Sequence, residues 1–156
     1  MDNRKLILDR LAQHIEELRG FTRGLSEAQL RARPAPNKWS LHELTMHMVE
    51  VQDIFIERVA RMLSEERPSI TPFSPDAARK EGMYLSLTFR KRMEDFELQR
   101  RNLFTLVGNL NDAQWRREGA HPDIKHYTLE KCLESLMRHE EHHLHQMFNL
   151  FFGISD

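Results

Sequence analysis

The chain has little cysteine and no segment typical of export. Its 156 residues include a single cysteine, Cys132, so no disulfide can form within one molecule. Proteins of reducing compartments rarely use disulfides. The first residues, MDNRKLILDR, alternate charged and apolar groups and lack the continuous apolar core of a signal peptide. We therefore expect a cytoplasmic protein.

An excess of basic residues is also absent. The chain has 23 Lys and Arg against 24 Asp and Glu, for a formal net charge of -1. Proteins that bind nucleic acid through its phosphates need a positive surface, so we expect no nucleic-acid partner. The basic residues at 90–92 and 100–101 are separated by acidic ones, which is typical of a solvated helix face. No apolar run approaches the roughly 18 residues that cross a membrane, so we expect no membrane partner.

The length of the chain suits one domain over residues 1–156. Four segments carry apolar residues at intervals of three and four, as amphipathic helices do. These segments are about 3–19, 41–63, 84–110 and 129–152. Ser40 and Glu43 form a capping box at the start of the second segment, and Thr128 is a suitable N-cap for the fourth.

The connection between the second and third segments is long and irregular, because it contains Pro68, Pro72 and Pro75. No segment of the chain is predicted as a strand. The sequence therefore predicts an all-α four-helix bundle with a long crossover between helices 2 and 3. Such a crossover allows those two helices to run parallel to each other.

Histidine is the abundant residue, with nine copies. His139 and His143 lie on the apolar stripe of the last helix, about 40° apart and one turn along, so their rings can converge. Two imidazoles on a buried stripe need polar partners. His-x-x-x-His on a helix is a recurrent spacing of metal ligands, so a shared divalent cation would satisfy both.

A third histidine, His47, lies on the buried stripe of the second helix beside Leu44 and Val51. Three inward histidines on two helices predict a three-nitrogen metal site with open positions for water and substrate. This donor set favours Zn²⁺, Ni²⁺, Fe²⁺ or Co²⁺. His142 would replace His143 if the last helix were rotated, and that alternative stays open from the spacing alone.

The remaining histidines are predicted outside the site. His14 borders the apolar stripe of the first helix, and His42, next to a helix cap, is expected on the surface. His145 points away from the stripe of the last helix. His121 and His126 belong to the loop before that helix, and loop histidines are usually solvated.

Carboxylates near His47 are candidates for an acid–base group or a fourth ligand. Glu43 lies four residues before His47 but also completes the capping box, and Glu50 follows His47 by three residues. Glu50 is the predicted catalytic residue, with Asp53 as the alternative. A di-iron site is not expected, because the second Glu-x-x-His that it needs, at 118–121, falls in a loop. Cys132 is predicted as a small core residue.

Two stretches resemble one family. Residues 38–47 (KWSLHELTMH) resemble the Trp-Ser-x-x-Glu-x-x-x-His entry to the second helix of the DinB/YfiT-like family. Residues 139–147 (HEEHHLHQM) resemble its closing His-x-x-His-His-x-x-Gln segment, which ends in Ile or Met. The resemblance covers nearly the whole chain. It departs from the family pattern at Gln52-Asp53, where a glutamate is expected.

The resemblance implies an up-down-down-up four-helix bundle, often a homodimer, with a metal ion held by three histidines. On this chain the implied ligands are His47, His139 and His143, which favours His143 over His142. Members of the family include thiol S-transferases that act with bacillithiol or mycothiol, thiol-linked isomerases and a hydrolase.

Two classes of function follow as expectations. The first is a metal-dependent enzyme acting on a small molecule, either as a thiol S-transferase with a low-molecular-weight thiol cosubstrate or as a hydrolase. The second is a non-catalytic metal-binding or stress-associated dimeric module. In both, the apolar C-terminal residues at 147–148 and 150–152 would serve a homodimer interface.

Overall fold

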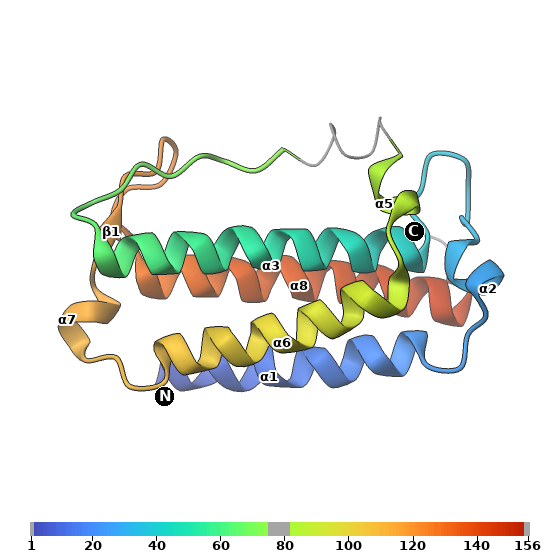
Figure 1. Cartoon of the computed structure of the whole chain (residues 1–156), viewed down its shortest axis with the longest axis horizontal. Coiled ribbons are helices and arrows are strands. Elements are labelled where there is room, and N and C mark those ends of the chain that lie inside the picture. The colour runs from blue at the N-terminus through green and yellow to red at the C-terminus, as the bar shows by residue number, and fades with distance from the viewer. Residues whose placement is uncertain (1, 75–81, 155–156) are drawn as a thin grey trace.

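The computed structural model describes residues 2–74 and 82–154, and its four long helices lie side by side as a bundle (Figure 1). These helices are α1 (Asn3–Thr22), α3 (Leu41–Ser64), α6 (Phe89–Val107) and α8 (Leu129–Phe152). The colour gradient in Figure 1 shows that α1 and α8 run in one direction and α3 and α6 in the other. The predicted four-helix bundle, up-down-down-up with α3 and α6 parallel, is confirmed.

Shorter elements occupy the connections. Helix α2 (Glu27–Arg31) links α1 to α3, and α5 (Met83–Ser86) precedes α6. Helix α7 (Asp112–Trp115) and the strands β1 (Glu118–Gly119) and β2 (Tyr127–Thr128) lie between α6 and α8. The two strands, which the sequence analysis did not predict, form an antiparallel pair.

The small strand pair fastens the long crossover to one end of the bundle. The Ile70 amide donates to the Ala120 carbonyl at 2.9 Å, and the Ala120 amide donates to the Pro68 carbonyl at 2.8 Å. A Cβ atom at Gly119 would lie 2.7 Å from the Ile70 side chain. Glycine at this position therefore allows the crossover to pack closely against β1.

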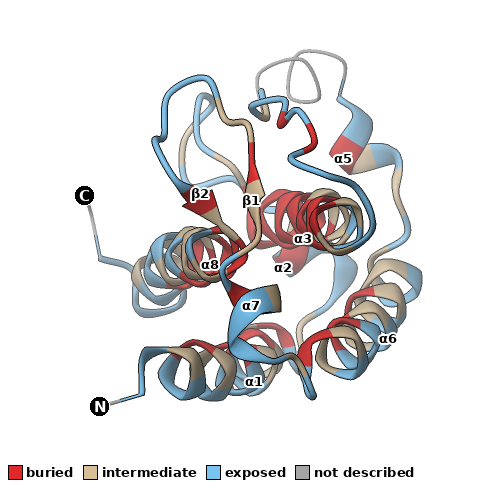
Figure 2. Cartoon of the chain, turned by 90° about the vertical axis from the view of Figure 1, so that its left-hand side faces the viewer, coloured by how far each residue is buried: buried red, intermediate tan, exposed pale blue. Residues whose placement is uncertain are grey.

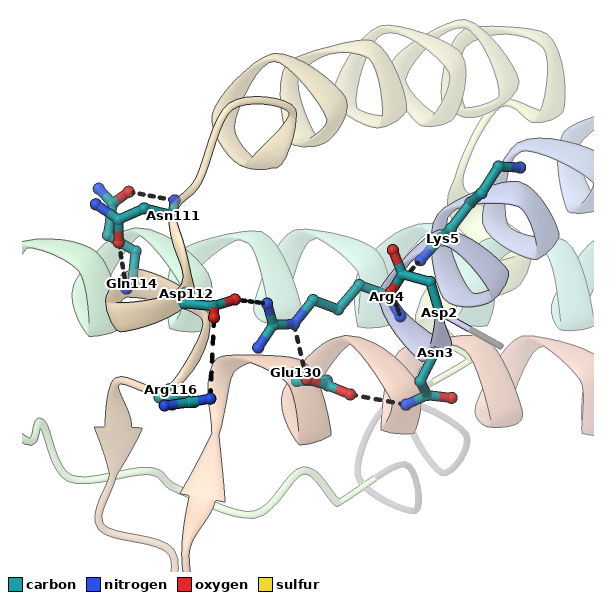
Figure 3. Close-up of polar contacts among 9 residues, drawn as sticks. All are labelled: Asp2, Asn3, Arg4, Lys5, Asn111, Asp112, Gln114, Arg116 and Glu130. Atoms are coloured by element: carbon teal, nitrogen blue, oxygen red, sulfur yellow. Dashed lines mark hydrogen bonds and ion pairs between the residues drawn. The ribbon is translucent and has the colours of Figure 1, made fainter.

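The start of α1 is joined to α7 and α8 by polar contacts (Figure 3). Arg4 donates from Nε to Glu130 at 3.0 Å and also pairs with Asp112. Asn3 donates to the other oxygen of Glu130 at 2.9 Å. These contacts hold the N-terminal turn of α1 beside the N-terminal turn of α8.

Helix boundaries differ from the prediction in the first helix and in the third, which ends at Val107 and not at residue 110. Helix α1 continues through Gly20 to Thr22, because the left-handed conformation that favours a stop occurs only at Gly24, where φ is +76°. The predicted third helix, 84–110, is divided into α5 and α6 by extended backbone at Leu87. The break allows α5 to pack against α3 on its own.

Buried residues face the centre of the bundle, and α3 is buried on nearly every side in its first half (Figure 2). The burial of individual side chains in the bundle corrects two predictions of exposed residues. His42, expected on the surface, is 1% exposed because α5 and α6 cover it as well. Arg100, expected on a solvated face, is fully buried.

Among residues 2–74 and 82–154, no helix is both long and apolar enough to cross a membrane.

Candidate metal centre

Three histidines converge where the second turn of α3 meets the middle of α8. The Nε2 atom of His139 lies 2.9 Å from Nε2 of His47 and 3.1 Å from Nε2 of His143. A ligand atom from each ring lies within 4.8 Å of the others. The structure therefore brings together the three residues that the sequence analysis predicted as ligands, although they come from positions about 90 residues apart.

The outer nitrogens of two rings are hydrogen-bonded away from the cluster. Nδ1 of His47 lies 3.1 Å from the Tyr84 hydroxyl, and the Tyr84 hydroxyl donates to Glu50. Nδ1 of His143 donates to the Gln146 side-chain oxygen at 2.6 Å. With the proton on Nδ1, a neutral imidazole carries its lone pair on Nε2, which here faces the cluster.

His139 completes the set in a different way. Its Nδ1 atom is buried and has no hydrogen-bond partner among the described residues. Its Nε2 atom lies between those of His47 and His143. Three Nε2 atoms that face one another at such short separations fit a cation, because lone pairs repel unless a positive charge lies between them. The donor set and its geometry therefore fit a divalent metal ion held by three imidazoles.

The protonation of the three rings also suits metal binding. Burial, together with the neighbouring imidazoles, lowers the pKa of His47 to about 3. Burial likewise lowers the pKa of His139 to about 4, and it lowers the pKa of His143. All three rings are thus neutral at neutral pH, which is the form that binds metal ions.

Aromatic side chains line the cluster on the α3 side. The Trp39 ring lies 4.9 Å from the ring of His47 and 6.5 Å from that of His143. Phe73, from the crossover, lies 5.6 Å from His47. These partly buried rings cover part of the His47 side chain, and lower exposure to water strengthens electrostatic interactions at a site.

The other histidines lie outside the cluster. His142 and His145 are exposed on α8, and the ring of His142 lies behind that of His143 at 5.0 Å. His126 is exposed and pairs with Glu118, while His121 packs on Tyr127. The rotation of α8 therefore turns His143, and not His142, toward α3.

The three candidate carboxylates have different partners. Glu43 accepts hydrogen bonds at the capping box and pairs with Arg33 at 2.6 Å. Asp53 lies 3.5 Å from Arg92 on α6. Glu50 alone of the three reaches a histidine of the cluster, through the hydroxyl of Tyr84.

Tyr84 is the site residue that the sequence analysis missed. The sequence pattern predicts Tyr84 as the first residue of a long third helix, and its local signal is an aromatic residue at the end of the crossover. Burial and the Glu50 carboxylate raise the pKa of Tyr84, so the hydroxyl keeps its proton. Cys132, by contrast, is a core residue as predicted: it is fully buried, and burial raises its pKa to about 11.

The sequence model of the DinB superfamily matches residues 10–147. The chain belongs to the DinB superfamily. This DinB-superfamily chain is 23% identical over 137 residues to the uncharacterized protein YuaE of Bacillus subtilis (strain 168). The alignment covers 80% of this chain and 85% of YuaE.

A solved structure shares the fold of this DinB-superfamily chain. YfiT from Bacillus subtilis, described as a probable metal-dependent hydrolase with an unusual four-helix bundle topology, superposes with a TM-score of 0.84. The match covers 97% of this chain and 89% of YfiT at 21% sequence identity. At that identity the likeness establishes the fold alone.

Proposed function

We propose that this DinB-superfamily chain is a metal-dependent hydrolase that acts on a small-molecule substrate. The observation that carries the proposal is the convergence of the three Nε2 atoms of His47, His139 and His143. The description of YfiT as a probable metal-dependent hydrolase supports the same class. A divalent ion such as Zn²⁺, Ni²⁺ or Fe²⁺ at three imidazoles supplies Lewis-acid chemistry, since it polarises a carbonyl and lowers the pKa of water or a thiol.

The chain's own residues have separate tasks in this proposal. His47, His139 and His143 hold the ion, and three protein ligands leave positions free for a substrate. Trp39 keeps water from one side of His47. Glu50 is the proposed acid–base residue, because it is the candidate carboxylate joined to the cluster and, among the described contacts, the Tyr84 hydroxyl uses only its Oε2 oxygen.

A second reaction uses the same donor set. Transfer of a low-molecular-weight thiol to an electrophile needs a thiolate at neutral pH, and a cation at three neutral imidazoles stabilises one. The chain's own thiol cannot replace that cosubstrate, because Cys132 is fully buried. Thiol transfer is therefore the second activity in the proposal, and a cytoplasmic location would supply the thiol.

Metal analysis and an activity screen test the proposal. Purified protein should hold one divalent ion per chain by mass spectrometry, and His47→Ala, His139→Ala and His143→Ala should each lose it. His145→Ala is the matched control, because His145 is an exposed histidine of the same helix. Ester, amide and thiol-conjugation substrates are then tested with metal-loaded protein. Stoichiometric metal without metal-dependent turnover would favour the alternative, a non-catalytic or stress-associated metal-binding module.

We also propose a homodimer through the C-terminal end of α8. Phe148, Phe151 and Phe152 are 41%, 51% and 59% exposed, and they form one apolar surface with Phe21. A second copy of the chain would cover these rings. Sedimentation equilibrium tests this assignment: the wild type should be a dimer, and Phe151→Asp should shift it toward monomer. A monomeric wild type would contradict it.

A further inference from the structure

We propose that Tyr84 and Glu50 are positioning residues that hold His47 in the tautomer with its proton on Nδ1, so that the Nε2 lone pair faces the metal centre. The inference rests on the metal centre of the proposed function. It concerns the Nδ1 side of His47. There a hydrogen bond joins the imidazole to the Tyr84 hydroxyl, and a second one joins the hydroxyl to the Glu50 carboxylate.

The direction of both hydrogen bonds between these three residues follows from the Glu50 carboxylate. A carboxylate oxygen accepts, so the single proton of the Tyr84 hydroxyl is donated to Glu50. The hydroxyl oxygen then has only lone pairs to offer to Nδ1 of His47, 3.1 Å away. Nδ1 must therefore be the donor, and the neutral ring carries its lone pair on Nε2.

Tyr84 is held rigidly enough to impose that choice. The residue is 1% exposed, and its ring packs edge-on against Trp39 at 5.6 Å. His42 donates from Nε2 to the Tyr84 carbonyl at 2.8 Å, and Arg31 donates to the neighbouring Leu85 carbonyl at 2.8 Å. These two bonds fasten α5 to α3 and α2, so the hydroxyl keeps its place beside His47.

Removal of the Tyr84 hydroxyl and removal of the Glu50 carboxylate change the hydrogen bonding of His47 in different ways. In Tyr84→Phe the Nδ1–H of His47 loses its acceptor, and nothing else in the described contacts of His47 replaces it. In Glu50→Leu the Tyr84 hydroxyl loses its acceptor and can turn its proton toward Nδ1. That reversal places the ring proton on Nε2, where it competes with the metal ion for the lone pair. Glu50→Gln keeps an acceptor oxygen and should preserve the original direction.

The first test is the affinity for Co²⁺, measured by competition with a chromophoric chelator. Outer partners of ligand histidines typically contribute about 10–100-fold to metal affinity, so we expect a loss of that size in Tyr84→Phe and in Glu50→Leu. Glu50→Gln should stay within about threefold of the wild type. The matched control is Tyr127→Phe, which removes the other buried tyrosine hydroxyl; that hydroxyl is bonded to Arg58 and has no described contact with the three cluster histidines.

The second test reads the tautomer in the metal-free protein. Long-range ¹H–¹⁵N spectra should show His47 protonated on Nδ1 in the wild type, Glu50→Gln and Tyr127→Phe, and on Nε2 in Glu50→Leu. A wild-type His47 protonated on Nε2, or a Tyr84→Phe affinity equal to that of Tyr127→Phe, would overturn the inference. If the wild type binds no Co²⁺, the proposed function fails, while the tautomer of His47 still decides the inference.

Discussion

Arg100 and Glu140 form an ion pair at the centre of the bundle, with both side chains fully buried. The same guanidinium donates to the Leu11 carbonyl of α1 and to Gln52 of α3, at 2.6 Å for the latter. One side chain of α6 is therefore bonded to the other three long helices. Because Glu140 directly follows His139, this network helps to hold α8 in the rotation that turns the cluster histidines toward α3.

Loss of Arg100 should be strongly destabilising. Burial alone raises the pKa of Glu140, but Arg100 and His14 hold it below its ordinary value, so the carboxylate is charged in the folded protein. Arg100→Met leaves that charge without its main partner, and we expect a loss of about 3–5 kcal/mol in the free energy of unfolding.

Urea unfolding followed by circular dichroism measures this loss. The double variant Arg100→Met/Glu140→Gln removes both charges and should recover part of the stability. A single variant within about 1 kcal/mol of the wild type would contradict a stabilising role for the buried pair.

Gln146 should tune the metal centre through His143. Its side-chain oxygen accepts the proton of His143 Nδ1 at 2.6 Å. Gln146→Ala removes the acceptor and should weaken Co²⁺ binding by about 10–100-fold, whereas Gln146→Glu retains one. Equal affinities of the alanine and glutamate variants would show that this contact does not orient the ring.

Metal addition should stabilise the folded state. A ligand that binds only the native protein adds about 2.7 kcal/mol to the free energy of unfolding at 100 times its dissociation constant. Wild-type protein with Zn²⁺ should therefore unfold at a higher urea concentration, and a chelator should reverse the change. In His139→Ala the metal-dependent increase should disappear, and its persistence would place the metal elsewhere on the chain.

Stability should fall in acid through Glu43. Burial raises the pKa of this carboxyl, but hydrogen bonds from Arg33 and Ser40 outweigh burial and lower it below 4.5. A lowered folded-state pKa contributes stability that is fully present above the unfolded value and is lost as the pH falls through the folded one.

The variant Glu43→Gln isolates this contribution. It should lose about 1–3 kcal/mol near neutral pH, since it weakens hydrogen bonds to a charged group. The difference from the wild type should shrink as the pH falls below about 4. A difference that is independent of pH between about 3 and 7 would contradict a role for the Glu43 charge.

Much of the architecture could be predicted from local patterns. The bounds of α8 agree with the prediction because Thr128 caps its start and Gly153, with φ of +66°, ends it. His139 and His143 were found because spacing by four on an apolar stripe places two rings on one face of a helix. In α3 the capping box of Ser40 and Glu43 likewise defined the first turn.

Contacts between helices could not be predicted from the residue pattern within a single helix. His42 and Arg100 were predicted on the surface, because a single helix with mixed charges does not reveal that other elements cover its polar side. The bond between Arg100 and Glu140 depends on the packing of α6 against α8, which no spacing within one helix encodes.

The sequence by itself determined the helices, their caps and the apolar stripes that carry His47, His139 and His143. These features depend on interactions between residues a few positions apart, so they can be predicted from local periodicity. Tertiary structure alone decided that Tyr84 and Glu50 meet behind His47, because their contact requires the crossover to return α5 to the first half of α3. The contacts that orient the ligands are therefore long-range, even though the ligands themselves follow a local pattern.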